Sequence, residues 1–307
     1  MSEYAHERPT DAHGWGTSSA IPSAKRCTVD QPGHREAAAA LAQLSVAALK
    51  LGEASGSHAI GNLDGVGTTL LGAGTTLTAT HVVQNSLTVG ADAKVSVRAG
   101  GTAGTLSVLC TLSLGGAPTA PAGSLNLNDH DLIVTNGSAA DVALEIAAGR
   151  AGGTWNGKCI SSLAAGTNSR FALAYMQNGA AGAPRVADFD DRQGLTGGEV
   201  LVKYTLLSDT NLDGLVDGAD FSFLASNFGQ SGKAWTNGDF NYDGIVDGAD
   251  FSLLASNFGL STANFASPAP LPAALQAFAA TIPEPTVASV LLVAAGGMLL
   301  RRRWPWT

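Results

Sequence analysis

Apolar residues between positions 61 and 207 come in short runs separated by Gly, Asn and Asp. The clearest run covers residues 106–114, where apolar residues alternate with Ser and Thr. A period of two predicts a half-buried β-strand, in which Cys110 points inward as a small core residue. Similar runs occur at residues 77–79, 87–89, 95–97, 125–127, 132–134 and 200–206.

The regular spacing of these runs predicts a mainly β fold for residues 61–207. Short strands every 8 to 12 residues or so, with turn residues between them, are typical of a β-sandwich or of a β-solenoid. Aromatic residues make up only 6% of the chain, whereas Gly occupies 38 positions. This composition favours a short β-solenoid, because its tight corners need small residues, and leaves the β-sandwich as the alternative.

The same region resembles the β-helical, autotransporter-like repeat regions of bacterial surface proteins. This resemblance implies a solenoid fold and no particular chemistry. The segments that carry it are Gly67-Thr68-Thr69, Thr75-Thr76-Leu77-Thr78-Ala79, Gln84-Asn85-Ser86-Leu87-Thr88-Val89, Leu125-Asn126-Leu127-Asn128-Asp129, Asp131-Leu132-Ile133-Val134 and Thr154-Trp155-Asn156-Gly157.

Residues 1–60 differ from the rest. Residues 35–51 are rich in Ala and place Leu41, Leu44, Ala48 and Leu51 at helical spacing, which predicts a helix that ends at Gly52. A charged start followed by an apolar stretch, as in a secretory signal peptide, cannot be read there. Taken together with the export that the C-terminal tail implies below, this leads us to expect that the true start lies elsewhere, or that residues 1–60 are a mis-joined front end.

Two copies of one segment follow the β region. Residues 209–229 and 239–259 are identical at 17 of 21 positions. Each copy opens with a 12-residue loop that has oxygen-bearing side chains at positions 1, 3, 5, 9 and 12 and Gly at position 6, as a hard cation requires. Position 7 offers its backbone carbonyl, so its apolar side chain is expected to enter the core. The candidate calcium ligands are Asp209, Asn211, Asp213, Leu215, Asp217 and Asp220 in the first loop and Asp239, Asn241, Asp243, Ile245, Asp247 and Asp250 in the second.

A short amphipathic helix is expected after each loop. Phe221, Leu224, Ala225 and Phe228 form one face of the first helix, and the second copy repeats this face. Each helix is too short to be stable alone, so the two are expected to pack together. Four carboxylates repel one another in each loop until a cation neutralises them, so binding of two Ca²⁺ ions should be coupled to folding.

A duplicated calcium loop with an exiting helix resembles the dockerin domain, and we assign it to residues 208–262. A complete EF-hand fits less well, because each loop ends in Asp and no entering helix precedes it. The resemblance implies the two ligand sets above and a cohesin-like partner. Many cohesin-binding members have hydroxyl residues where this chain has Gly218-Ala219 and Gly248-Ala249. Calcium binding therefore carries over, whereas recognition of a cohesin-like partner carries over less well.

The tail follows a Pro- and Ala-rich linker at residues 263–282. It consists of Pro283, Glu284 and Pro285, an apolar stretch at residues 286–300, and the basic cluster Arg301, Arg302 and Arg303. As a helix the apolar stretch would span about 22 Å, whereas a bilayer core of about 30 Å prefers a helix of roughly 20 residues. The flanking arginines can make up part of this difference. The ordered trio at residues 283–307 resembles the PEP-CTERM sorting signal. This resemblance implies processing by an exosortase-type enzyme, export, and a hydrophobic membrane helix.

Charge and composition narrow the class of function. The chain has 25 acidic and 17 basic residues, and its two loops hold eight aspartates; without them 17 acidic residues remain, which equals the basic count. Acidity is therefore local, and no basic surface favours a nucleic-acid partner. The three cysteines show no metal-binding spacing. The cluster Asp129-His130-Asp131 is expected to be solvated surface.

No motif indicates catalysis. The six histidines form no HExxH motif, and GxSxG and phosphate-binding loops are absent from the sequence. Only Trp155 and Tyr175 could serve as aromatic platforms for a sugar in the β region. We therefore expect a non-catalytic, exported cell-surface protein with a calcium-binding module and a processed anchor. The alternatives are a docking or carbohydrate-binding component of an extracellular polysaccharide-degrading system and, less favoured, a glycoside hydrolase.

Overall fold

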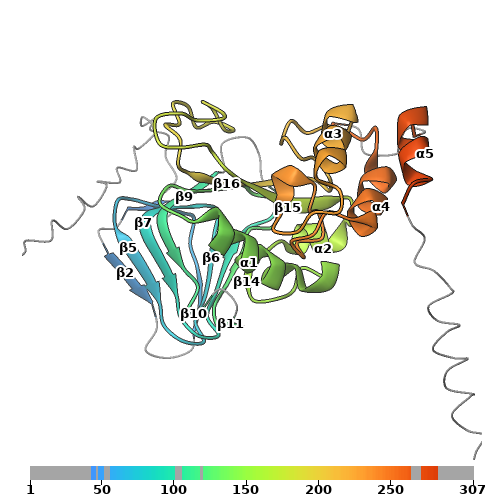
Figure 1. Cartoon of the computed structure of the whole chain (residues 1–307). Helices are drawn as coiled ribbons and strands as arrows, with labels where there is room; N and C mark the ends of the chain where they lie inside the picture. The colour runs from blue at the N-terminus through green and yellow to red at the C-terminus, as the bar shows by residue number, and fades with distance from the viewer. Residues whose placement is uncertain are drawn as a thin grey trace, which may run out of the picture.

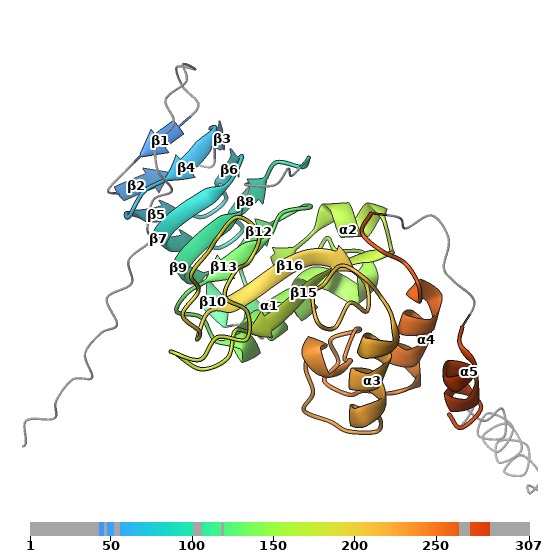
Figure 2. The ribbon, with the colours of Figure 1, turned by 90° about the horizontal axis from the view of Figure 1, so that it is seen from above.

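The computed structural model describes residues 43–45, 48–51, 56–100, 106–117, 120–263 and 271–282. These residues form a mixed α/β structure in which two sheets lie beside a small group of helices (Figures 1 and 2). The large sheet has nine strands, and the small one has five. An antiparallel ribbon of β10 (Gly116–Ala117) and β11 (Ala120–Pro121) adds a third pairing.

The large sheet contains most of the long strands. Its main order is β1 (Gln43–Ser45), β4 (Asn62–Asp64), β7 (Val82–Val89), β9 (Ser107–Ser113), β13 (Leu132–Val134), β16 (Val200–Leu206) and β15 (Phe171–Gln177). In addition, β5 (Thr68–Leu71) pairs with β7, and β2 (Ala48–Leu51) pairs with β5. All these pairs are parallel except β13–β16 and β15–β16, which are antiparallel.

The small sheet is parallel throughout. Its order is β14 (Cys159–Ser161), β12 (Ser124–Asn126), β8 (Lys94–Val97), β6 (Thr76–Ala79) and β3 (Ser57–Ala59). From β6 to β14 the chain returns to each sheet in turn, which explains why neighbouring strands run in the same direction.

The main hydrophobic core takes residues from both sheets. Leu71 and Leu87 of the large sheet and Leu77 and Val95 of the small sheet are all inaccessible to solvent and belong to one cluster. Burial of such side chains is worth about 2 kcal/mol each, so the alternating apolar positions are the main source of stability in this part.

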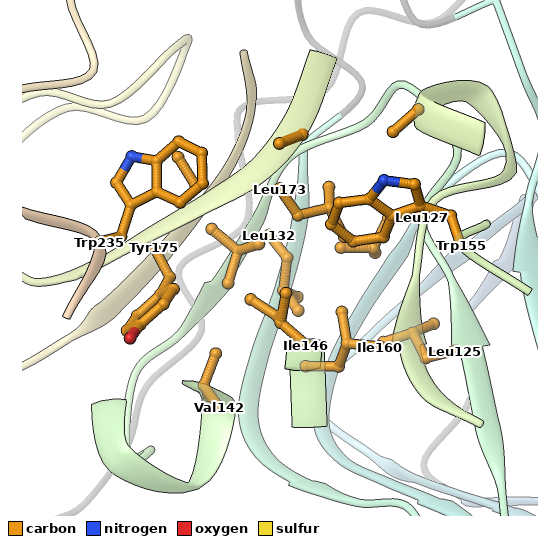
Figure 3. Packing of buried hydrophobic residues seen from close by; sticks show 14 of the residues in the cluster. Leu125, Leu127, Leu132, Val142, Ile146, Trp155, Ile160, Leu173, Tyr175 and Trp235 are labelled. Atoms are coloured by element: carbon orange, nitrogen blue, oxygen red, sulfur yellow. The ribbon is translucent and has the colours of Figure 1, made fainter. Parts of the chain in front are cut away.

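Helix α1 (Ala139–Arg150) covers the core between β13 and β14. Ser138 caps its N-terminus by accepting a hydrogen bond from the backbone N–H of Asp141. Figure 3 shows Ile146 of this helix between Leu132 and Ile160. The helix approaches β14 so closely that a Cβ atom on Gly149 would lie 1.8 Å from the carbonyl oxygen of Ile160. Glycine is therefore required for this contact. The short helices η1 (Ala151–Gly153) and α2 (Leu163–Thr167) follow.

A second, smaller core lies on the other face of the large sheet. The connection between β15 and β16, residues 178–199, folds over this face and contributes Phe189 and Leu195, which pack with Ile133, Met176 and Leu201. Buried Asn178 fixes the connection, because its side-chain oxygen accepts hydrogen bonds from the backbone N–H groups of residues 185 and 186. Both faces of the large sheet are therefore covered here.

The prediction of a mainly β-solenoid is wrong, and so is the β-sandwich alternative. The structure is mixed α/β, with a large sheet that ends in an antiparallel pair and with helices that complete the core. Most of the short strands lie where the sequence places them. What the pattern missed is that the Ala-rich segment of α1 is helical and that β15 and β16 pair with each other.

The helix predicted at residues 35–51 is wrong wherever this segment is described. Strand β1 pairs in parallel with β4, and Ala48–Leu51 form β2, which pairs in parallel with β5. The local preference of Ala and Leu for a helix is worth only a few tenths of a kcal/mol per residue, so pairing with an existing sheet edge outweighs it.

The remaining helices follow β16 and form the C-terminal part. They are α3 (Gly218–Asn227), η2 (Trp235–Asn237), α4 (Gly248–Asn257) and α5 (Ala273–Ala279). Helix α5 lies within the range assigned to a linker and places Phe278 against Phe221, Phe228 and Phe251, with ring centroids 5.0–5.3 Å apart. The predicted apolar helix at residues 286–300 lies outside the described residues. Among the helices that are described, none has the length and apolar character needed to span a membrane.

Candidate metal centre

The two predicted loops lie next to β15, the edge strand of the large sheet (Figures 1 and 2). The first loop starts at Asp209, three residues after β16 ends, and leads into α3. The second starts at Asp239, after η2, and leads into α4. Each loop is thus held between a fixed entry point and the N-terminus of a helix.

The first aspartate of each loop organises the turn. Asp209 is fully buried, and its two carboxylate oxygens accept hydrogen bonds from the backbone N–H groups of Asp213 (3.1 Å) and Gly214 (2.9 Å). The hydroxyl of Thr205 also donates to this carboxylate. Asp239 makes the equivalent bonds to Asp243 (3.2 Å) and Gly244 (2.9 Å).

The last aspartate of each loop closes it. One oxygen of Asp220 accepts from the N–H of Thr210 (2.7 Å) and the other from the N–H of Asp217 (2.8 Å), while Asp217 caps α3 through the N–H of Ala219. This capping box recurs at Asp247 and Asp250, at the start of α4. The carboxylate at position 12 therefore ties the start of the loop to the start of the helix.

The backbone of both loops takes the same unusual shape. Gly214 and Gly244 have φ of 81°, as the sequence pattern predicts for position 6. Position 4 is also left-handed, with φ of 67° at Leu212 and 64° at Tyr242. Apolar and aromatic residues rarely adopt this conformation, so the loop imposes it at some energetic cost. No signal in the sequence marks position 4 as strained.

The buried carboxylates are expensive to ionise without a cation. Burial raises the pKa of Asp220, Asp239 and Asp250 to about 6, although backbone hydrogen bonds oppose this rise. Burial also raises the pKa of Asp209. The charges of neighbouring loop aspartates add to each of these shifts. A bound cation would remove this penalty because it stabilises the ionised form.

The donor set of each loop fits calcium. Each loop supplies carboxylate and amide oxygens together with the backbone carbonyl of residue 215 or 245, which is the oxygen-only set that Ca²⁺ prefers. Within the part of the chain that the structure describes, however, no three acidic, His or Cys side chains converge as a metal cluster. In each loop the Asn at position 3 donates instead to the Asp at position 5, at 2.7 and 2.8 Å.

The prediction that position 7 enters the core is wrong. Leu215 and Ile245 are 36% and 43% exposed, whereas the following residues, Val216 and Val246, are fully buried. Each position-7 residue forms a β-bridge, Leu215 with Ser261 and Ile245 with Ser231. Neighbouring side chains in extended backbone point in opposite directions, so burial of position 8 exposes position 7.

The second loop also makes contacts that the sequence pattern did not predict. Tyr242, at position 4, donates a hydrogen bond from its hydroxyl to the carbonyl oxygen of Leu173 in β15 (2.9 Å). Trp155 and Tyr175, the two candidate sugar platforms, are 3% and 4% exposed and pack against this tyrosine. Figure 3 shows Tyr175 beside Trp235 in the core. Neither ring is free to bind a carbohydrate.

A charged cluster on the large sheet was missed as well. Lys203 Nζ lies 3.1 Å from an Asp131 oxygen and 2.7 Å from an Asp190 oxygen, and the second Asp131 oxygen accepts from the N–H of Tyr204. His130 is 4% exposed, so the expectation that residues 129–131 are solvated surface is wrong at this position. Lys203 is 72 residues from Asp131 and 13 residues from Asp190 in the chain, so no local motif predicts these ion pairs.

The predicted sorting residues Pro283, Glu284, Pro285, Arg301, Arg302 and Arg303 lie outside the described residues. Comparison with known proteins found no match among protein families, curated proteins or solved structures.

Proposed function

We propose that this is a non-catalytic, exported cell-surface protein in which two Ca²⁺ ions stabilise the C-terminal helices. The observation that carries the calcium assignment is the repeat of one hydrogen-bond network in both loops, down to the left-handed residue at position 4. A turn that merely leads into a helix has no need for four carboxylates, and burial makes these carboxylates costly.

Calcium would act on this module as a structural ion. Four aspartates per loop repel one another, and two of the four are buried beside the hydrophobic faces of α3 and α4. A cation that neutralises them favours the folded loop, and the loop in turn fixes the first turn of its helix through the capping box. The residues that would supply the ligands are those at loop positions 1, 3, 5, 7, 9 and 12.

Export and anchoring rest on the tail sequence. The PEP motif, apolar stretch and arginine cluster at residues 283–307 support processing by an exosortase-type enzyme and a membrane-anchored or surface-exposed product. Mass spectrometry of the mature protein from its own host would test this part of the proposal. Recovery of a tail-containing peptide from the cell surface would contradict processing.

Calorimetric titration of the full chain with CaCl₂ tests the metal proposal. We expect two bound ions per chain and a rise in the unfolding temperature compared with EDTA. The variants Asp213→Asn and Asp243→Asn should each lose one site, because each removes one charged ligand from a different loop. Magnesium chloride serves as the ionic control, since Mg²⁺ fits such flexible loops less well. Absence of calcium heat from a folded wild-type chain would contradict the proposal.

A further inference from the structure

The second loop differs from the first in what it contacts, and this difference points to a role beyond ion binding. We infer that the second loop docks the C-terminal helices onto the α/β body, and that calcium loading of this loop and the docking strengthen each other. The inference rests on the proposed calcium function.

Tyr242 provides the main contact of this interface. Its hydroxyl donates to the Leu173 carbonyl oxygen in β15 at 2.9 Å. Its ring packs edge-on against Trp155 at 6.1 Å between centroids and lies nearly parallel to the ring of Tyr175 at 6.3 Å. The first loop has Leu212 at the same position, with almost the same φ, and a leucine can make neither the hydrogen bond nor the ring contacts.

Arg150 also contacts this stretch of the loop. This arginine lies in the last turn of α1, and its Nη1 donates to the backbone carbonyl oxygen of Asn241 at 3.2 Å. Its guanidinium carbon lies 5.7 Å from the centre of the Tyr242 ring, within range of a cation–π contact. Two elements of the α/β body, α1 and β15, therefore form hydrogen bonds with consecutive residues of one loop.

Trp235 extends the contact to the first loop. This residue is fully buried, and its indole N–H donates to the backbone carbonyl oxygen of Asp209 at 2.7 Å. Its ring centroid lies 5.4 Å from that of Tyr242 and 5.3 Å from that of Phe240. Position 1 of the first loop and position 4 of the second thus pack on one tryptophan.

The residues that make these contacts, Asn241 and Tyr242, lie among the candidate ligands of the second loop. Asn241 and Asp243 would bind the ion through their side chains, and Tyr242 stands between them in the chain. An ion that fixes the backbone of residues 241–243 also fixes the position of the Tyr242 ring and of the Asn241 carbonyl. By linkage, whatever calcium adds to docking, docking must add to calcium affinity. The first loop lacks the tyrosine and the arginine contact, so the two sites should differ in affinity.

The test uses two matched substitutions in the full chain. Tyr242→Leu gives the second loop the residue that the first loop already carries at position 4, so the loop can keep its shape. Phe223→Leu is the control, because Phe223 is 45% exposed and the second copy has Leu253 at this position. Both changes replace an aromatic ring by leucine, and only the first touches the interface.

Calcium titration and the unfolding temperature, with and without calcium, are the readouts. We expect Tyr242→Leu to weaken one of the two sites by about fivefold or more, as for a coupling of 1 kcal/mol or above. It should also reduce the rise in unfolding temperature that calcium produces. Phe223→Leu should leave both sites and that rise unchanged. A smaller loss is expected for Tyr242→Phe, which removes only the hydroxyl that reaches Leu173.

The outcomes separate the two proposals. If neither wild type nor Phe223→Leu binds calcium, the proposed function fails. If wild type binds two ions and Tyr242→Leu behaves like Phe223→Leu, the docking inference fails and calcium binding stands. If Tyr242→Leu does not fold, Tyr242→Phe decides, because it keeps the ring; unchanged affinity and unchanged calcium stabilisation in that variant would overturn the inference.

Discussion

At the residue scale, the close approach of helix α1 to strand β14 depends on one glycine. A Cβ at Gly149 would lie 1.8 Å from the Ile160 carbonyl oxygen, and the contacted atom is backbone of β14, which cannot rotate away. We expect Gly149→Ala to destabilise the fold by roughly 3 kcal/mol, the upper range for overpacking, despite the better helix propensity of alanine. Chemical denaturation of wild type and variant measures the difference.

Gly218→Ala is the matched control for this prediction. Gly218 is the first residue of α3, and nothing lies within 4 Å of a Cβ added there. The same substitution should therefore be neutral or slightly stabilising when calcium is in excess. Equal effects at residues 149 and 218 would show that helix α1 can move away from β14.

Glu145 makes the stability of the fold decrease as the pH rises. Burial, followed by the charge of Asp141 one turn earlier, raises the pKa of Glu145 to about 7. The folded state therefore holds this proton more tightly than the unfolded state, whose glutamates have a pKa of 4.5. The resulting stability is fully present below pH 4.5 and is lost as the pH rises to about 7.

Replacing this glutamate should remove that dependence. Glu145→Gln cannot ionise, so we expect its unfolding temperature to exceed that of wild type at pH 8 and to differ little from it at pH 4.5. Thermal unfolding at the two pH values, with calcium in excess, measures both differences. A constant difference between the two proteins at both pH values would mean that Glu145 ionises freely in the folded state.

At the element scale, α5 stabilises the pair α3 and α4. Phe278 contacts Phe221 of α3, Phe228 directly after α3 and Phe251 of α4. Leu275 of the same turn is 2% exposed. Phe278 itself is half-buried, so Phe278→Ala should cost about 2 kcal/mol, less than a full core truncation. Phe223→Ala makes the same change at an exposed site of α3 and should cost well under 1 kcal/mol. Denaturation of both variants in calcium compares them, and equal costs would place α5 outside the stable module.

The elements that could be predicted are those specified by local sequence. The loops and the helices that follow them have fixed spacings of oxygen, Gly and apolar residues, and α3 and α4 lie where those spacings place them. The strand pattern likewise located β9 (Ser107–Ser113) and β16 (Val200–Leu206). The failures at β1 and β2 have a different cause, because these segments become strands by pairing with β4 and β5, which lie further along the chain and which a local pattern does not reveal.

At the scale of the whole molecule, the sequence could not show which residues the fold brings together. Tyr242 and Leu173 are 69 positions apart, and Arg150 and Asn241 are 91 apart. Within the loop itself, Tyr242 looks like a tolerated variant of the leucine in the first copy. This difference matters because α1 and β15 lie beside the second loop. The two loops were therefore predictable from the sequence, whereas their contacts with the body were not.

One continuous hydrophobic core predicts how the whole molecule unfolds. The main cluster runs from Leu63 in the large sheet to Leu275 in α5 without a break between body and C-terminal helices. With calcium bound, we therefore expect a single calorimetric transition for the described fold. Removal of calcium should act first on α3 and α4, because their helix starts depend on the loops, whereas the sheets keep their own hydrogen bonds.

Scanning calorimetry of the full chain in EDTA should then show two transitions, with the C-terminal helices unfolding at the lower temperature. Hydrogen exchange assigns each transition, since amides of α3 and α4 would lose protection before those of β7 and β9. Tyr242→Leu should widen the separation, because it removes the hydrogen bond from the Tyr242 hydroxyl to the Leu173 carbonyl oxygen in β15. A single transition in EDTA at the temperature seen with calcium would show that the loops contribute nothing to the stability of the fold.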